Sequence, residues 1–280
     1  MSDHAIPCTV QVLTRNSMPG VERCLKTLTH FAEVIVQDGH STDGTREAVK
    51  KFPNVTLMDQ DRKYLDREGR ITNFAEMRNE SIDAAKYDWV FVVDGDEEIT
   101  VAMEDEVRKI VGKNVPGVFQ AFRRFIVGGV PVMFCCGYPT IQIRLFHRTL
   151  TQGYTKSVHE RLVLRPGVIP EMLSHELPTP LPPAYKLRAK YHRYLQMEVR
   201  RLGVISWGRW FRWILIRHLK TAFGYSLRVL WFRVTPKPGK RMPLAYEWQF
   251  IAHALRTIVA TCPPVAARTL SKEATASHTS

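Results

Sequence analysis

Several features that define other protein classes are missing from this 280-residue chain. It has no run of about 18 uncharged apolar residues, so we expect no membrane-spanning helix. Residues 1–4 show no basic stretch followed by an apolar one, so we expect no secretory signal. The five cysteines are odd in number and include no Cys-x-x-Cys. This pattern favours reduced cysteines in the cytosol that serve for packing, and it argues against a zinc site.

Acidic residues are scarce in one segment. The chain has a net charge of +13, and residues 185–241 hold 15 lysines and arginines against a single acid, Glu198. Residues 1–184 are close to neutral. The asymmetry predicts that the basic segment meets an anionic surface.

The first half of the chain alternates between short apolar strands and amphipathic helices. Strands are predicted over residues 8–14, 34–37, 55–58 and 89–93, and a helix over 70–86. Further strands are predicted over 118–127, 130–134, 141–146 and 158–164, with a hairpin at Gly128-Gly129. The order favours an α/β fold with a nucleotide-binding, doubly wound mixed sheet flanked by helices.

Proline marks the expected domain boundary. The stretch 177–183 contains four prolines, and the segment after it is basic and helical in pattern. We therefore expect one domain over residues 1–184, a helical basic and aromatic segment over 185–265, and a disordered tail over 266–280.

The predicted strand 89–93 is central because carboxylates follow it at once. Its continuous apolar run is typical of a parallel strand buried on both faces. Asp94 and Asp96 flank Gly95 at its carboxyl end, where open α/β sheets bind ligands. Two neighbouring carboxylates repel each other unless a cation lies between them, and hard oxygen ligands suit Mg²⁺ or Mn²⁺. An acidic, solvated turn is the alternative.

Four blocks of the sequence resemble the family-2 inverting glycosyltransferases with the GT-A fold. The blocks are Val10-Gln-Val-Leu-Thr-Arg-Asn16, Glu22-Arg-Cys-Leu25, Val36-Gln-Asp-Gly-His-Ser-Thr-Asp-Gly-Thr45 and Val93-Asp-Gly-Asp-Glu97. Three later blocks resemble the branch that contains lipopolysaccharide-core β-1,4-glucosyltransferases: Arg144-Leu-Phe146, Val158-His-Glu160 and Leu173-Ser-His175. The resemblance covers about residues 8–200, and His40 departs from the small residue usual at its position.

The resemblance implies roles for the residues around the nucleotide. Asp96 should bind Mg²⁺ or Mn²⁺ directly, and Asp94 should lie near the ribose and the waters of the metal. The base of the nucleotide should face Asp38. The same pocket should be lined by Thr14 and Asn16. Arg70 and Arg78 either reach the diphosphate or face water, and Thr42 and Asp43 are favoured as helix caps.

An inverting transfer also needs a base that takes the proton of the acceptor. The resemblance favours Glu160 as this base, with His159 positioning the acceptor or the diphosphate. The alternative is an ordinary strand in which Glu160 pairs with an arginine. Glu97, Glu98 and Asp105 are rival carboxylates, and a structural role is favoured for His175.

The segment 204–234 combines arginine with tryptophan. On a helix, one face would carry Trp207, Phe211, Ile214, Leu215, Leu219 and Ala222, and the other Arg209, Arg212, Arg217 and Lys220. This pattern predicts a helix in a membrane interface, which Gly224 could divide. Packing on the first domain or at a dimer interface is the alternative. No nucleic-acid partner is expected, because Trp and Ile dominate the segment.

Together these patterns predict an inverting, metal-dependent glycosyltransferase at the cytoplasmic face of the cell membrane. It would use a nucleotide-sugar, preferably a UDP-sugar, and a lipid-linked saccharide or lipopolysaccharide-core acceptor. A nucleotidyltransferase is one alternative, although the turn after the first strand lacks the expected Gly-rich loop. A non-catalytic membrane- or RNA-binding protein on a transferase fold is the other.

Overall fold

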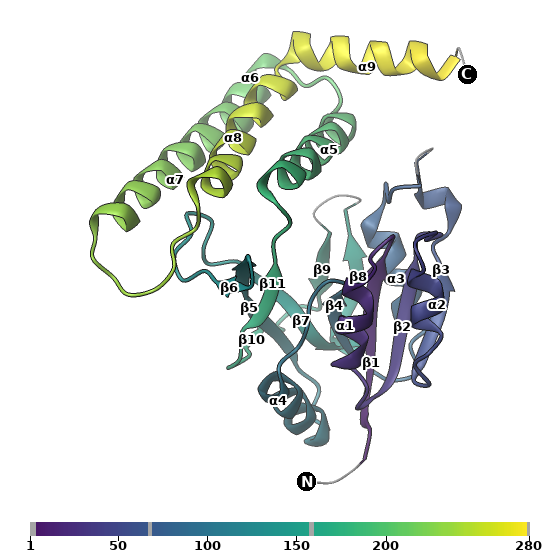
Figure 1. Cartoon of the computed structure of the whole chain (residues 1–280). Helices are drawn as coiled ribbons and strands as arrows, with labels where there is room; N and C mark the ends of the chain where they lie inside the picture. The colour runs from purple at the N-terminus through teal and green to yellow at the C-terminus, as the bar shows by residue number, and fades with distance from the viewer. Residues whose placement is uncertain (1–3, 67–68, 157–159, 279–280) are drawn as a thin grey trace. The chain divides into compact units, whose positions relative to one another are not determined.

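The computed structural model describes residues 4–66, 69–156 and 160–278, with side chains of the last helix described up to Ser271. The chain divides into two compact units (Figure 1). The first comprises Met1–Phe125 and Pro139–Pro180, and the second comprises Ile126–Tyr138 and Leu181–Ser280. The expected boundary at residue 184 lies close to the second break, but the hairpin region 126–138 groups with the C-terminal helices.

A mixed sheet forms the centre of the first unit, with the strand order β10-β5-β7-β4-β1-β2-β3. The strands are β1 (Ile6–Thr14), β2 (Phe31–Asp38), β3 (Val55–Asp59), β4 (Trp89–Asp94), β5 (Val118–Val127), β7 (Ile141–His147), β10 (Glu171–Met172) and β11 (Leu177–Pro180), which pairs with β5. Strands β1 to β4 are parallel, whereas β7 runs antiparallel to β4 and β5. The mixed α/β fold predicted from the sequence is confirmed.

Helices cover both faces of this sheet. One face carries α1 (Gly20–Lys26), α2 (Thr45–Val49) and α4 (Val101–Gly112), and the other carries α3 (Phe74–Asp83) and the hairpin of β8 (Thr151–Thr155) and β9 (Arg161–Leu164). Short 3₁₀ turns, η1 (Arg62–Tyr64) and η2 (Arg148–Leu150), connect elements. Strand β4 contributes Phe91 to one apolar cluster and Val90 to the other, so it is buried on both faces as predicted.

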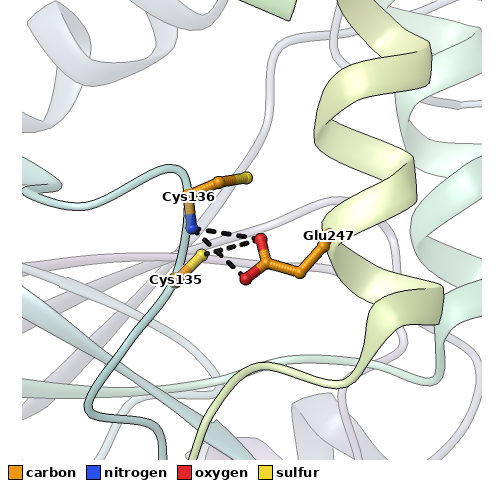
Figure 2. A group of neighbouring side chains, drawn as sticks. All are labelled: Cys135, Cys136 and Glu247. Atoms are coloured by element: carbon orange, nitrogen blue, oxygen red, sulfur yellow. Dashed lines mark hydrogen bonds between the residues drawn. The ribbon is translucent and has the colours of Figure 1, made fainter. Parts of the chain in front are cut away.

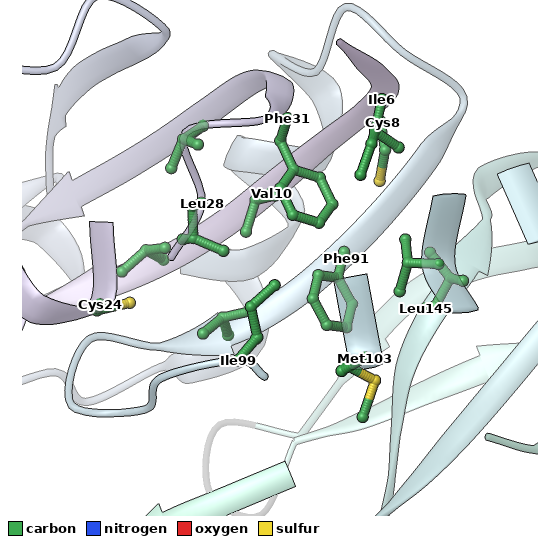
Figure 3. Close-up of a cluster of buried hydrophobic side chains, with 14 of the residues drawn as sticks. Ile6, Cys8, Val10, Cys24, Leu28, Phe31, Phe91, Ile99, Met103 and Leu145 are labelled. Atoms are coloured by element: carbon green, nitrogen blue, oxygen red, sulfur yellow. The ribbon is translucent and has the colours of Figure 1, made fainter. Parts of the chain in front are cut away.

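The larger cluster contains two of the cysteines. Phe31 and Phe91 stack with ring centroids 5.8 Å apart, and Cys8 and Cys24 lie among the apolar side chains around them (Figure 3). Burial raises the pKa of both thiols. These two cysteines are packing residues, as the sequence indicated.

Helix α3 is shorter than the predicted 70–86. The side chain of Asn73 accepts the backbone N–H of Glu76 at 3.3 Å and so fixes the start of the helix. Leu65 and Ile71 form an isolated bridge, which holds the preceding residues outside the helix. The cap therefore overrides an apolar periodicity that begins earlier.

The second unit contains a short hairpin and a group of helices. The hairpin pairs the end of β5 with β6 (Val130–Pro131), which is shorter than the predicted 130–134. The helices are α5 (Ala184–Leu202), α6 (Trp207–Arg209), the π-helical segment η3 (Trp210–Leu215), α7 (Ile216–Val234), α8 (Leu244–Thr261) and α9 (Pro263–His278). Helix α8 packs against both α5 and α7 (Figure 1).

The basic aromatic helix differs from its prediction in two ways. Helix α7 continues through Gly224 without a break, and the irregularity lies earlier, in η3. The predicted apolar face is also divided, since Ala222 is buried while Leu219 is 47% exposed. Alpha-helical spacing does not carry across the wider π-turn, and α8 covers only part of the face.

The last residues also differ from the prediction. The tail expected to be disordered over 266–280 lies largely within α9. Pro263 and Pro264 suit the first helical turn, and the alanines that follow have high helix propensity. No single helix in the described part of the chain has the length and apolarity to cross a membrane; α8 and the start of α9 meet that criterion only as a pair bent by 78°.

Candidate active site

The parallel strands bring the predicted residues to one edge of the sheet. Thr14 is paired with Asp38 across β1 and β2, and Leu13 with Asp94 across β1 and β4. The carboxyl ends of these strands therefore coincide, which is where open α/β sheets bind ligands.

A tight turn follows β4. The backbone N–H of Asp94 donates to Glu97 Oε2 at 3.0 Å, and the N–H of Glu97 donates to the Asp94 carbonyl at 2.9 Å. Glycine suits position 95, because a Cβ there would make tight contacts, 3.2 Å from the carbonyl oxygen of Leu13 and 3.3 Å from Thr14 Oγ1. Asp96 lies within the turn and is exposed.

Thr14 presents an unpaired polar atom beside this turn. Its side chain is 5% exposed, and its Oγ1 has no hydrogen-bond partner among the described residues. Its carbonyl accepts the N–H of Gly39 at 2.9 Å. A buried hydroxyl without a partner is costly, so this atom is a candidate contact for a water or a polar ligand.

Three arginines surround Asp94. Its carboxylate lies 3.4 Å from Arg78, 3.7 Å from Arg123 and 3.5 Å from Arg144. The carboxylate is 34% exposed, so it still meets solvent on one side. Three guanidinium groups are therefore gathered around the carboxylate that the sequence analysis expected near the ribose and the waters of the metal.

Glu97 is the buried partner of this group. Its carboxylate accepts Arg144 Nη2 at 2.9 Å and the hydroxyl of Thr179 at 3.0 Å, and the side chain is fully buried. Burial raises the pKa of Glu97, while the guanidinium groups of Arg144 and Arg123 oppose the rise. A side chain enclosed in this way offers no surface to an acceptor, which favours another carboxylate as the base.

Glu160 lies near the same arginines. Its Oε1 accepts Arg78 Nε at 3.0 Å, and Arg78 Nη1 donates to Gln11 at 3.2 Å. Arg78 is 7% exposed and so does not simply face water. Glu160 therefore pairs with an arginine, as the alternative interpretation expected. The same arginine, Arg78, connects Glu160 to Asp94. His159 lies outside the described residues.

A cavity of about 820 Å³ borders these groups within the first unit. Arg78, Arg144, Tyr154 and Glu160 lie on its wall. Asp94 and Asp96 are not among its lining residues, so the cavity is on the Glu160 side of Arg78. It has the size range of a small-molecule site.

Asp38 organises the turn after β2. Its carboxylate accepts the N–H of Ser41 at 2.8 Å and Arg46 Nη1 at 2.9 Å, and the residue is fully buried. Asn16 fastens the same turn, accepting the N–H of Thr42 at 2.9 Å. Its φ of +46° is a left-handed conformation that asparagine tolerates. A nucleotide contact by Asp38 stays a prediction.

The remaining candidates lie in local ion pairs. Arg70 pairs with Asp66 at 2.9 Å. Glu98 pairs with Arg23 at 2.9 Å on the surface, and His175 pairs with Glu106 at 2.8 Å. Asp43 accepts the N–H of Thr45 at 3.1 Å, but the N-cap of α2 is Gly44, so the prediction of Thr42 or Asp43 as the cap is wrong. A structural role for His175 stays a prediction.

Sequence reasoning missed Arg123 and the buried pair of Arg144 with Glu97. Arg144 was noticed only as part of a block that resembles the glycosyltransferase branch. A lone arginine inside an apolar strand is a signal that could have found the pair, because a buried cation needs a counter-charge.

The family model described as Glycosyl transferase family 2 matches residues 9–157. No curated protein matches the chain. The match spans every candidate residue named above from Thr14 to Arg144.

Solved structures with a similar backbone are distant relatives in sequence. The TarS structure from S. aureus is 15% identical with a TM-score of 0.44, covering 90% of this chain and 55% of that one. TarS 1–349 in complex with UDP-GlcNAc is 14% identical with a TM-score of 0.45, covering 94% and 91%. The mannosyltransferase PcManGT from Pyrobaculum calidifontis, in complex with GDP-Man and Mn²⁺, is 17% identical with a TM-score of 0.43, covering 98% and 80%. Identities this low transfer no donor, metal or acceptor.

Proposed function

Because the chain belongs to glycosyl transferase family 2, we propose that it is an inverting enzyme that moves a sugar from a nucleotide-sugar to a membrane-borne acceptor. Glycosyl transfer itself follows from the family. The inversion, the metal, the donor base, the acceptor and the membrane location are parts of the proposal.

One observation carries the proposal: the series of contacts from Glu160 through Arg78 to Asp94. Arg78 lies 3.0 Å from the first carboxylate and 3.4 Å from the second. A single displacement needs a base on one side of the sugar and positive charge near the leaving diphosphate on the other. This arrangement supplies a candidate for each within one unit of the protein.

The residues after β4 fit a divalent cation. Asp94 and Asp96 offer hard oxygen ligands at the end of a strand, and the unpaired Thr14 Oγ1 adds a polar atom beside them. Asp96, supported by Asp94, would hold Mg²⁺ or Mn²⁺. When bound, the ion supplies Lewis-acid charge for the departing diphosphate.

The side chains of the protein then have distinct tasks. Glu160 takes the proton of the acceptor hydroxyl. At the same time the oxygen of the acceptor bonds to the anomeric carbon of the sugar, and the bond between that carbon and the diphosphate breaks. Arg78 holds Glu160 in place and contributes positive charge. Thr14, Asn16, Asp38 and Arg70 line the nucleotide, and His159 positions the acceptor.

A thermal-shift screen of the full chain tests the donor part of the proposal. UDP, GDP, ADP and CDP are compared with and without Mn²⁺, since a bound ligand raises the melting temperature by mass action. We expect UDP with Mn²⁺ to give the largest rise. A folded protein whose melting temperature responds to none of these nucleotides would contradict nucleotide-sugar use.

We further propose that the second unit binds an anionic membrane at the cytoplasmic face of the cell membrane. Trp207, Phe211 and Trp231 are each more than half exposed, in the segment that carries 15 basic residues and one acid. Aromatic rings suit the headgroup region and arginines suit anionic lipid. A lipid-linked saccharide or a lipopolysaccharide core is the acceptor that such a position would serve.

Sedimentation of the full chain with vesicles tests this part. Vesicles of phosphatidylcholine alone are compared with vesicles that also contain phosphatidylglycerol. We expect binding to the anionic vesicles, weakened by salt because the attraction is screened. Equal recovery in the supernatant with both vesicle types would overturn the membrane role and leave the transfer reaction unaffected.

A further inference from the structure

The second unit contains a buried group of side chains that the proposed transfer does not use. Cys135 and Cys136 follow β6 in the chain, and Glu247 lies on α8 (Figure 2). None of the three is more than 3% exposed. One ligand atom from each lies within 4.8 Å of the other two, and this is the sole such group of His, Cys, Asp and Glu in the described part of the chain.

Glu247 is a buried carboxylate without a cationic partner. It accepts the backbone N–H of Cys136 at 3.1 Å and the thiol of Cys135 at 3.9 Å (Figure 2). Among the described residues, no lysine, arginine or histidine forms an ion pair with it. Burial raises the pKa of Glu247, and the hydrogen bonds from Cys136 and the charge of Arg233 offset part of the rise. A cation bound here would supply the missing positive charge.

The surroundings of the thiols also suit a metal. The N–H of Gly137 donates to Cys135 Sγ at 3.4 Å, and metal-bound sulfurs commonly receive such support. Arg228 Nη1 donates to the carbonyls of Cys136 at 3.1 Å and Tyr138 at 2.9 Å. Two thiolates and one carboxylate around a divalent ion leave one negative charge, and the charge of Arg233, which already acts on Glu247, would offset part of it.

We propose that Cys135, Cys136 and Glu247 bind a thiophilic divalent cation, for which Zn²⁺ is the best match. Sulfur ligands select Zn²⁺ and exclude Mg²⁺, which prefers oxygen. Two sulfurs bound to one zinc at about 2.3 Å stand about 3.8 Å apart, so the group needs to contract by about 1 Å at most. Binding releases the two thiol protons and leaves a fourth coordination position for water.

Such a site would fasten the segment after β6 to α8. The free energy of binding would then add to the stability of the second unit. It would also give the chain two sites of opposite character, a hard oxygen site in the first unit and a soft sulfur site in the second.

The test uses the reduced full chain after removal of metal with EDTA. It is titrated with Cd²⁺ alone and with Zn²⁺ alone, in excess Mg²⁺ so that the oxygen site is occupied. We expect one Cd²⁺ per chain with the ultraviolet charge-transfer band of a cadmium–thiolate pair, displacement of that band by Zn²⁺, and a rise in melting temperature with Zn²⁺.

Variants locate the ion. Glu247→Gln keeps an acceptor for the N–H of Cys136, so we expect a folded protein whose affinity for Zn²⁺ falls by at least about tenfold. Cys135→Ser and Cys136→Ser should each weaken the cadmium band. Cys262→Ser is the matched control, because this cysteine is also in the second unit but outside the group, and it should leave the band intact.

Two results would overturn the proposal. One is the lack of a cadmium–thiolate band in the folded wild-type chain, which needs no variant. The other is an equal loss in Cys262→Ser, which would indicate unspecific binding by thiols. Asp96→Asn should leave the band unchanged, so failure here and failure of the transfer reaction are separate outcomes.

Discussion

The two units differ in whether their buried charges are paired within the chain. In the first, Glu97 and Arg144 are both buried and lie 2.9 Å apart, so the buried charge has its counter-charge within the chain. In the second, Glu247 is buried without an ion pair in the described residues, and large apolar side chains such as Trp213 remain 63% exposed. The buried charge of the first unit is paired within the chain, whereas the second unit keeps a buried carboxylate without an ion pair among its described residues and leaves large apolar side chains exposed.

The largest effect on the comparison of the two units is expected from a change at the proposed oxygen site of Asp94 and Asp96. Asp96→Asn should lower the rate of transfer by more than about 10²-fold, because charge stabilisation of the leaving group is lost. Initial rates with a UDP-sugar and Mn²⁺ measure it. Asp83→Asn at the exposed end of α3, another carboxylate of the first unit, should keep the normal rate. Unchanged turnover of Asp96→Asn would remove its role in metal binding.

The next largest effect is expected for kcat when the candidate base, Glu160, is changed. Glu160→Gln should reduce kcat by about 10²-fold or more while the KM of the donor stays the same, because only proton removal is impaired. Steady-state kinetics with both substrates varied separate these two quantities. Glu171→Gln on the exposed β10 is the matched control. Full activity of Glu160→Gln would place the base elsewhere.

The buried pair of Arg144 and Glu97 tests how much the matching of buried charges stabilises the first unit. Arg144→Met should lower the free energy of unfolding by up to about 3–5 kcal/mol, because the buried Glu97 loses its nearest guanidinium and keeps only that of Arg123, at 3.3 Å. The surface pair of Arg148 with Asp88 provides the contrast, and Arg148→Met should cost about 0–1 kcal/mol. Urea denaturation measures both. Equal losses would mean that burial does not distinguish the two pairs, and Glu97→Gln should restore part of the stability of Arg144→Met.

The surface of the second unit should respond to loss of cations. Replacing Arg212 and Arg217 by Gln should weaken binding to anionic vesicles by about 30-fold, from about 1 kcal/mol for each charge near the membrane. Co-sedimentation gives the partition coefficients. The same substitution at Arg23 and Arg148 of the first unit should have little effect. Similar losses in both double variants would show that net charge, and not this helix, governs binding.

The smallest effect concerns pH. Burial alone would raise the pKa of Glu106, but the hydrogen bonds from Ser174 and His175 lower it below its ordinary value. The stabilisation by a lowered carboxyl pKa is present above the unfolded pKa and is lost as pH falls through the folded pKa. Glu106→Gln should therefore destabilise the protein at neutral pH and flatten the acid limb of a melting-temperature curve. An unchanged acid limb would contradict this role.

Much of the first unit could be predicted from the sequence because the signals were local. The apolar run before Asp94 identified a strand buried on both faces, and Gly95 marked the tight turn after it. The carboxyl ends of parallel strands meet by topology, so the grouping of Thr14, Asp38 and Asp94 also followed.

Long-range pairings could not be predicted in the same way. Nothing near Glu160 in the chain indicates Arg78, and nothing near Cys135 indicates Glu247, since each pair joins segments far apart in sequence. Cysteine spacing argues against a zinc site, and the site proposed at Cys135, Cys136 and Glu247 departs from that expectation because the rule considers only neighbours along the chain. The tail was predicted to be disordered because its composition is polar, but its alanines have high helix propensity and it is helical.

The π-helical segment between α6 and α7 affects how the exposed side chains of these two helices are aligned. A residue inserted into a helix turns everything beyond it by about 100° about the axis. The wide turn at Trp210–Leu215 absorbs one extra residue, so the rings of α6 and the exposed side chains of α7 keep nearly the relative angle of an uninterrupted α-helix. Deleting one residue from this turn should therefore restore α-helical pairing with little rotation of Trp207 relative to Leu219.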